Sequence, residues 1–359
     1  MAFVKISRAI LYAYELPLKR ELVLYGESYL SREGLLLELQ TDTGDEAWGD
    51  ICPLPWFSQE KLIHSEEMAR RELRELVGRD IDDIRQKFVP PSLAFGVETA
   101  ILQLRTRKNG VLPAELLSPG CRRRISVNGL LTGDDESIFC RARDLVEAGF
   151  RSLKLKVGRR TVDEDTRLVK ELRRIVGDSV SLRLDGNHLM PPDSYEQFAR
   201  AVVTENIEYI EEPTNDPDTF YGAHPKLEQI LPVAIDELLS LTRPDNLKNL
   251  VGGAAAIVVK PTILGFDKAH RFCEVAKRLS IPATISAAFC SAVGLLPHVW
   301  LAAAVNDRDI ASGFDSANWF ADDLLKPGVD MSNGYIDLAR LPDPETCLDR
   351  TLLMEIDRA

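Results

Sequence analysis

Five ionisable side chains stand at the ends of short apolar stretches in the middle of the chain, spaced roughly 25 residues apart. A strand, a loop, a helix and a return loop need about that many residues, so each step predicts one βα unit. The carboxyl ends of the strands in a (β/α)₈ barrel all face one rim, where active sites gather. We therefore expect one pocket at that rim to be lined by Lys156, Asp185, Glu211, Asp236 and Lys260.

The three acids predict a site for a hard divalent cation. Asp185, Glu211 and Asp236 offer only carboxylate oxygens, which favour Mg²⁺ or Mn²⁺ over Zn²⁺. Three converging carboxylates would repel one another without a cation. Any single carboxylate after a strand could instead cap the next helix. Three such acids on consecutive strands favour a metal site.

The lysines predict proton transfer beside that metal. Lys156 and Lys260 end the second and sixth predicted strands, so we expect them on opposite sides of the cation. Lys154 lies on the same strand face as Lys156, and its charge is expected to favour a neutral amine there. A metal that binds a substrate carboxylate makes the α-proton acidic, and a lysine can then remove this proton. The predicted partner is accordingly a small-molecule carboxylate substrate.

Bulk properties exclude several other classes. The formal net charge of −12 argues against nucleic acid as a partner. The N-terminus lacks the apolar core of a signal peptide, and the six scattered cysteines suit reduced thiols in the cytoplasm. Residues 279–305 contain no charged side chain, but proline, glycine and serine interrupt the run, which favours a buried strand and helix over a membrane span. No particular oligomeric state is indicated.

The elements that must position the rim residues form an α/β protein with three segments. Residues 1–120 predict an α+β capping domain, in which residues 22–33 form a surface loop that could serve as an active-site lid. Residues 121–320 predict a modified TIM barrel of seven or eight βα units. Its strands are expected near residues 125, 152, 181, 207, 232, 255 and 282, with a weak eighth at 309–313. Residues 321–359 are expected to pack back on the capping domain.

The motifs around the rim residues resemble the enolase superfamily, and within it the muconate-lactonising subgroup. The matching segments are Lys154-Leu-Lys156, Asp185-Gly-Asn187, Glu211-Glu-Pro213, Asp236-Glu237 and Lys260-Pro261. Finer matches resemble the o-succinylbenzoate synthase family, at residues 48–55, 56–60, 91–97 and 259–262. Three features depart from that family: Asp50 replaces a glutamate, Cys290 replaces another, and the tail lacks a PGLG motif.

This resemblance implies a reaction and a role for each residue. The reaction would be loss of water from 2-succinyl-6-hydroxy-2,4-cyclohexadiene-1-carboxylate, giving 2-succinylbenzoate on the route to menaquinone or phylloquinone. Lys156 would remove and return the proton, Lys260 would stabilise the enediolate, and the three acids would hold Mg²⁺. The residues expected around the substrate and the metal ligands are Arg183, Asn187, Glu237 and Ser286.

Two other functions remain open at this point. A racemase of N-succinylamino acids or an epimerase of dipeptides, from the same subgroup, would use Lys156 and Lys260 as bases on the two faces of the substrate. A barrel that kept only its metal site as a binding module would need neither lysine.

Overall fold

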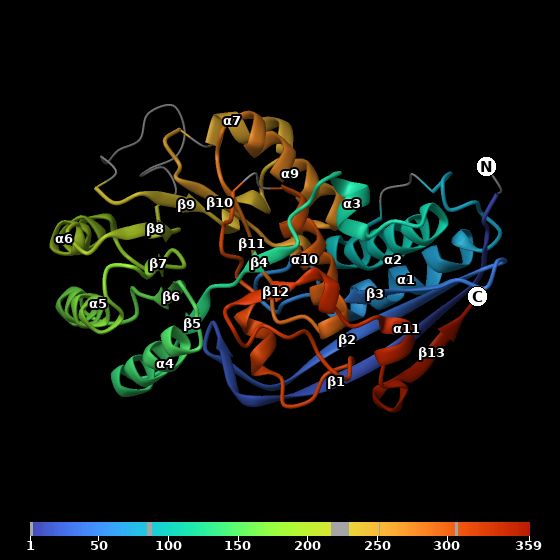
Figure 1. Ribbon diagram of the computed structural model, residues 1–359, viewed down its shortest axis with the longest axis horizontal. Helices are drawn as coiled ribbons and strands as arrows, with labels where there is room; N and C mark the ends of the chain where they lie inside the picture. Colours follow the sequence, from blue (N-terminus) through green and yellow to red (C-terminus); the bar gives the residue numbers. More distant parts are fainter. Residues whose placement is uncertain (1–2, 85–87, 217–229, 251, 306–307) are drawn as a thin grey trace.

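The computed structural model describes residues 3–84, 88–216, 230–250, 252–305 and 308–359 (Figure 1). These residues form a curled parallel sheet with helices around it and, beside it, a four-stranded antiparallel sheet with two helices. This is the predicted α/β class. The domain boundaries near residues 120 and 320 stay predictions.

The parallel sheet has seven strands in the order β11-β10-β9-β8-β7-β6-β5. Its two edges are joined by residues near the weak eighth strand, since Ser312 pairs with Val127 and Gly313 pairs with Ser286, both as single parallel bridges. The sequence therefore located the closing segment, although it forms bridges and not a strand. The strand bounds are β5 (Gly129–Leu131), β6 (Ser152–Lys156), β7 (Ser181–Asp185), β8 (Ile207–Glu211), β9 (Val233–Ile235), β10 (Ala256–Val259) and β11 (Ala283–Ile285).

The first barrel strand differs from the prediction. We expected one strand over residues 125–131, but this segment is divided between two sheets. β4 (Arg124–Ser126) pairs antiparallel with β12 (Tyr335–Asp337), and only β5 joins the barrel. The short apolar run near residue 335 thus supplies a partner strand for the beginning of the barrel segment.

Most of the helices around the barrel carry one apolar stripe that packs against the sheet. The clearest case is α5 (Val162–Val176), where Leu168, Leu172 and Val176 are buried. A capping box formed by Thr161 and Glu164 begins this helix. The other barrel helices are α4 (Asp135–Glu147), α6 (Pro192–Val202), α7 (Leu247–Leu250), α8 (Pro261–Leu264), α9 (Phe266–Arg278) and α10 (Ala292–Val305).

The middle of β2 is buried on both faces. In β2 the alternating residues Leu35, Leu37 and Leu39 pack toward the helices, whereas Leu36 packs toward the larger core that fills the barrel. The strand order is β13-β1-β2-β3, so the C-terminal strand completes the sheet. Bounds here are β1 (Ile6–Leu24), β2 (Glu27–Thr41), β3 (Glu46–Ile51), β13 (Met354–Arg358), α1 (Leu62–Leu76), α2 (Pro91–Asn109), α3 (Pro113–Leu117) and α11 (Pro344–Cys347).

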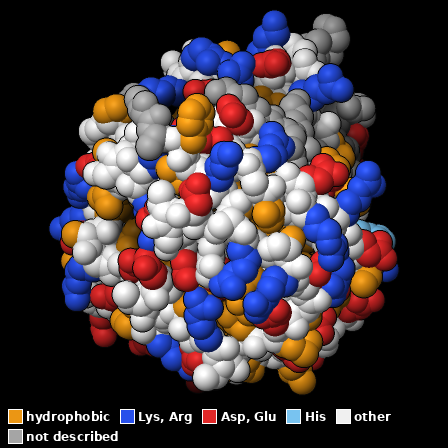
Figure 2. All heavy atoms as spheres, turned by 90° about the vertical axis from the view of Figure 1, so that its right-hand side faces the viewer, with side chains coloured by type: hydrophobic (Ala, Val, Ile, Leu, Met, Phe, Trp, Pro, Cys, Tyr) orange, Lys and Arg blue, Asp and Glu red, His pale blue; other side chains and the backbone are white. Residues whose placement is uncertain are grey.

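The outer surface over this sheet is mixed in charge. Figure 2 shows the side of the molecule that carries the chain ends, where basic and acidic side chains are interspersed. Arg74 of α1 and Asp357 of β13 form one such pair, with their atoms 2.9 Å apart.

The segment 22–33 is not the irregular loop that we expected. It is the end of a hairpin in which β1 and β2 are joined by a two-residue turn, Tyr25-Gly26, with positive φ angles of 47° and 86°. Two positive φ values are typical of the tight turns that suit twisted hairpins. Leu22 and Leu24 pack against Ile263 of the barrel, so the hairpin lies over the barrel rim.

The uncharged stretch 279–305 is folded into the barrel. It contains β11 and α10, and nearly every residue of α10 is buried. The prediction of a buried strand followed by a buried helix is therefore confirmed. Among the described residues, no helix has both the length and the apolar character needed to cross a membrane.

Candidate active site

The five predicted residues lie at one end of the parallel sheet. Lys156, Asp185 and Glu211 are the last residues of three adjacent strands, β6, β7 and β8. Strand pairing places Lys156 opposite Asp185, and Asp185 opposite Glu211. Asp236 and Lys260 follow directly after β9 and β10. The βα spacing therefore located all five at the same rim.

Lys154 links two of the acids. Its Nζ atom lies 2.8 Å from Asp185 Oδ2 and 2.5 Å from Glu211 Oε2, and only 11% of its side chain is exposed. Burial disfavours the ammonium, but the attraction of Asp185, Glu211 and Asp236 outweighs it and holds the pKa of Lys154 well above its usual value. Lys154 is thus a buried positive charge among the carboxylates.

The other two lysines approach from either side. Lys156 Nζ donates to Asp185 Oδ2 at 2.8 Å and to Asn187 Oδ1 at 2.5 Å. Lys260 Nζ donates to Asp236 Oδ2 at 2.5 Å and lies 5.6 Å from the ring centre of Phe57. Lys156 and Lys260 are 30% and 15% exposed, so both can be reached from the rim.

The three acids fit a hard cation by their chemistry and burial. Asp185, Glu211 and Asp236 are 1%, 1% and 4% exposed. Burial raises the pKa of Glu211, and burial together with Glu237 raises that of Asp236 well above its usual value. For Asp185 the three lysines outweigh burial and lower the pKa. Buried carboxylates whose side-chain partners are lysines are a donor set that suits Mg²⁺ or Mn²⁺.

A different group has its ligand atoms closest together. Within the described ranges, the one group of three such residues with all ligand atoms within 4.8 Å is His188, Glu212 and Glu237. Among the described residues, the predicted acids Asp185, Glu211 and Asp236 do not form such a group. Their carboxylates are paired instead with the ammonium groups of Lys154 and Lys260. The acids of the rim are therefore held by lysines in this conformation.

The residues predicted to surround the substrate and the metal ligands lie in different places. Asn187 Nδ2 donates to Glu237 Oε1 at 3.1 Å. Asn187 also accepts a hydrogen bond from Lys156, and Glu237 Oε1 lies 3.7 Å from Lys260 Nζ. Ser286 is buried where the barrel closes and donates to Gly313 O at 3.4 Å. Arg183, however, points away from the rim that we predicted for it.

Arg183 lies two residues before Asp185 and faces the opposite end of the barrel. It donates to Glu208 at 2.9 and 3.0 Å and to the carbonyl oxygen of Ala311 at 2.6 Å. In a strand, residues two apart share a face but are displaced along it. A motif position alone could not show which end of the barrel this long side chain would reach.

Sequence reasoning missed the role of Glu212. This carboxylate is 1% exposed and accepts hydrogen bonds from the backbone nitrogens of Asp236 and Leu238, at 2.8 and 3.3 Å. It thereby fixes the loop that carries Asp236. Burial raises the pKa of Glu212 to about 7, against the opposing effect of His188. Its place beside Glu211 in Glu211-Glu-Pro213 was the available signal.

Asp50, which departs from the glutamate of the family, lies in a tightly packed place. Asp50 is buried and accepts hydrogen bonds from Tyr14 and from the backbone and hydroxyl of Ser291. A Cβ atom on Gly294 would lie 2.2 Å from Asp50 Oδ2, so α10 approaches this carboxylate closely. The shorter side chain thus joins β3 to the barrel helix α10.

Comparisons with known proteins agree with this architecture. Residues 139–343 match the family model described as enolase C-terminal domain-like, and residues 6–104 match that of the MenC N-terminal domain. The dipeptide epimerase from Enterococcus faecalis V583, complexed with Mg and the dipeptide L-Leu-L-Tyr, is similar in structure. Its TM-score is 0.83 at 20% identity, over 95% of this chain and 99% of that chain. The chain therefore belongs to the enolase superfamily.

Two curated relatives narrow the family. The o-succinylbenzoate synthase of Aliivibrio fischeri (strain MJ11) is 31% identical over 346 residues, covering 94% of this chain and 98% of that protein. "Protein PHYLLO, chloroplastic" of Arabidopsis thaliana is 28% identical over 345 residues, and the chain spans 20% of its length. Within the superfamily, the chain belongs to the o-succinylbenzoate synthase family.

Proposed function

We propose that this protein dehydrates 2-succinyl-6-hydroxy-2,4-cyclohexadiene-1-carboxylate to 2-succinylbenzoate, as a hydro-lyase in menaquinone or phylloquinone biosynthesis. An o-succinylbenzoate synthase that matches 94% of this chain supports this reaction. The observation that carries the proposal is the placement of Lys156 and Lys260 on either side of three buried carboxylates. This arrangement brings an amine within reach of the α-proton of a carboxylate that is bound there.

Asp185, Glu211 and Asp236 would hold the metal, with Mg²⁺ as the proposed ion. The cation would supply positive charge for the substrate carboxylate and for the enediolate that forms from it. Glu212 would keep Asp236 in place through the backbone of its loop. Asn187 and Glu237 would fix the lysines by their hydrogen bond and ion-pair contacts.

Lys156 would perform both proton transfers. As the neutral amine it takes the α-proton, and the C–H electron pair enters the enediolate. The electrons then return to form the ring double bond, and the hydroxyl group leaves with the proton that Lys156 carried, as water. Because the product is aromatic, the elimination needs only modest acid-base assistance. Asn187 Oδ1, 2.5 Å from Nζ, would keep the amine in position throughout.

Lys260 would stabilise the enediolate by its charge from the other side of the site. The Phe57 ring and the hairpin of β1 and β2 lie over this rim, where Leu22, Leu24 and Ile263 form a small apolar cluster. We propose that this apolar cover lowers the dielectric constant around the reacting atoms and so strengthens the effect of the lysine charge. The six free cysteines support a reducing compartment, the cytoplasm, as the site of action.

A racemase or epimerase is the second candidate, because one lysine lies on each side of the acids. The similarity of the fold to a dipeptide epimerase also supports it. In that reaction Lys260 would exchange a proton with the substrate and would not act through charge alone.

One experiment separates the two candidates. Purified protein with Mg²⁺ is incubated in D₂O with the cyclohexadiene substrate or with an N-succinylamino acid. We expect formation of 2-succinylbenzoate and at least tenfold slower incorporation of deuterium into the N-succinylamino acid. Rapid deuterium incorporation without dehydration would make the racemase the correct function.

A further inference from the structure

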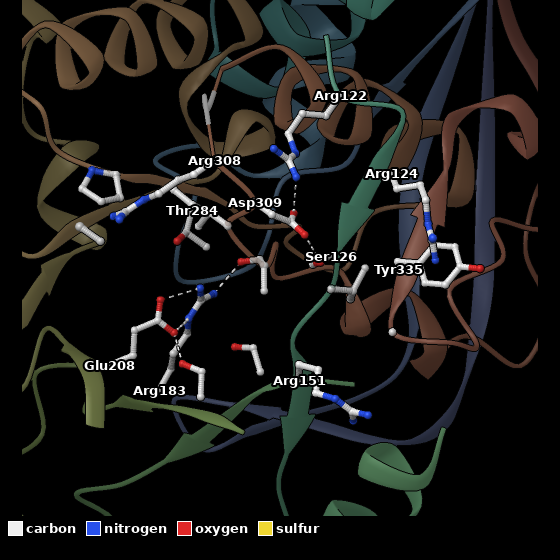
Figure 3. Close-up of a pocket in the computed structure, with 18 of the residues that line it drawn as sticks. Arg122, Arg124, Ser126, Arg151, Arg183, Glu208, Thr284, Arg308, Asp309 and Tyr335 are labelled. Atoms are coloured by element: carbon white, nitrogen blue, oxygen red, sulfur yellow. Dashed lines mark hydrogen bonds and ion pairs between the residues drawn. The ribbon is translucent and has the colours of Figure 1, made fainter. Parts of the chain in front are cut away.

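The end of the barrel opposite the five rim residues contains a large open cavity (Figure 3). Its volume is about 800 Å³, and it lies where β6 and β7 begin, at Ser152 and Ser181. The proposed dehydration does not use this cavity. Five arginines contribute to its lining: Arg122, Arg124, Arg151, Arg183 and Arg308.

The lining is strongly basic in an acidic protein. The only carboxylates among the lining residues of the described chain are Glu208 and Asp309, against five guanidinium groups. The cavity is therefore locally positive, although the net charge of the whole chain is −12. A concave surface of one sign focuses the electrostatic field and raises the local concentration of counter-ions.

Both carboxylates already have arginine partners. Glu208 pairs with Arg183 at 2.9 Å, and Asp309 Oδ1 lies 3.7 Å from Arg122 Nη2 (Figure 3). Asp309 also accepts a hydrogen bond from Ser126. Little negative charge is therefore left for the remaining three arginines.

Those three have no carboxylate oxygen within 4.0 Å in the described part of the chain. Arg124 stacks over the ring of Tyr335, with its Cζ atom 3.5 Å from the ring centre. Arg151 donates only to carbonyl oxygens, those of Val146 and Phe150. All three, including Arg308, are exposed. Arg308 contributes, with Arg183, to the lowered pKa of Glu208, so these three charges are only partly neutralised near the cavity.

Two donors in the wall strengthen this interpretation. Arg122 Nε and Ser152 Oγ are buried, and neither has a hydrogen-bond partner among the described residues. Both residues line the cavity. Buried polar atoms are normally satisfied, so these two donors are available to water or to an anion in the cavity.

We propose that this cavity is a binding site for a compact polyanion that carries several carboxylate or phosphoryl oxygens. Guanidinium groups bind both kinds of oxygen with paired hydrogen bonds, and the cavity has room for a small organic acid or phosphate ester. Arg124, Arg151 and Arg308 attract the anion to the opening, and Arg122 and Ser152 donate to it from the wall. This site is separate from the active site and does not depend on the reaction catalysed there.

Calorimetric titration of the full-length protein in Mg²⁺ buffer tests the proposal, with inorganic phosphate and tricarballylate as the two probes and chloride at equal ionic strength as reference. We expect saturable binding of one anion per chain. The probe that binds more tightly identifies the carboxylate or the phosphoryl class. The double variant R124Q/R308Q should bind about tenfold or more weakly, as expected on loss of charge-assisted hydrogen bonds.

The control is R174Q/R200Q, which removes the same charge from two exposed arginines on α5 and α6. It should bind as the wild type does. If the double variant R124Q/R308Q fails to fold, the single variant R308Q, at an exposed position, provides the same comparison with a severalfold weakening. Absence of saturable binding, or equal weakening in the control, would overturn the proposal. Binding that R124Q/R308Q leaves unchanged would place the anion elsewhere and also overturn it.

Discussion

Replacement of Lys154 by methionine should destabilise the protein strongly without metal and much less with it. The ammonium of Lys154 lies 2.8 Å from Asp185 and 2.5 Å from Glu211, and these carboxylate side chains are 1% and 2% exposed. Methionine keeps a similar length but leaves the two acids facing one another. A bound cation would replace the lost positive charge.

The size of the effect follows from two considerations. Two carboxylates about 5 Å apart repel by roughly 3 kcal/mol at an effective dielectric constant of about 20. Removal of one partner from a buried ion pair typically costs about 3–5 kcal/mol. We therefore expect K154M to lower the free energy of unfolding by about 3–5 kcal/mol in EDTA. In saturating Mg²⁺ we expect less than half of that loss, because the cation binds the folded state.

Urea unfolding followed by circular dichroism, with EDTA and with Mg²⁺, measures both values. The matched control is K108M, which removes a lysine from a surface ion pair with Asp82. K108M should change the free energy of unfolding by the same amount in EDTA and in Mg²⁺, since that ion pair lies away from the rim acids. Equal destabilisation of K154M in EDTA and Mg²⁺ would refute the idea that Lys154 and the metal neutralise the same carboxylates.

Three further predictions concern other parts of the molecule. K156A should lower kcat for dehydration by about 10²–10⁴-fold with unchanged circular dichroism, and activity within tenfold of the wild type would contradict the role of Lys156. Burial raises the pKa of Asp50 to about 6, so its contribution to stability is greatest below about pH 4 and is lost as the pH rises to 6. The free energy of unfolding of the wild type should fall by about 3 kcal/mol between pH 4 and 6, and D50N should lack this fall. An equal fall in both proteins, measured by unfolding curves across this pH range, would contradict the prediction. A Cβ atom on Gly49 would lie 1.9 Å from Gly96 O, so G49A should destabilise by about 1–3 kcal/mol or more, whereas G328A, which meets only one atom at 3.8 Å, should not.

The spacing of charged residues was a sufficient guide to the rim. The carboxyl ends of all strands in a parallel barrel face one rim, so a charge at each of these ends is placed by topology. Lys156, Asp185 and Glu211 are paired in register. The same reasoning could not show toward which end of the barrel a long side chain extends. Arg183 shares the strand face of Asp185, yet its contacts lie with Glu208 near the other end.

The errors in the N-terminal half have physical causes as well. Residues 22–33 show no clear pattern because most of the hairpin end is exposed, and only Leu22, Leu24 and Arg32 are buried. The β4 segment was merged with β5 because its partner, β12, lies about 200 residues away in sequence. Long-range pairing of this kind leaves little trace in the local pattern.

The central claim is that three carboxylates and two lysines at the barrel rim perform a metal-dependent dehydration. The most direct test is the rate of 2-succinylbenzoate formation by the purified protein after EDTA treatment and again after Mg²⁺ is restored. We expect EDTA to abolish the activity, and Mg²⁺ to restore it in the wild type but not in K156A. Turnover of the cyclohexadiene that continues unchanged in EDTA would contradict the account.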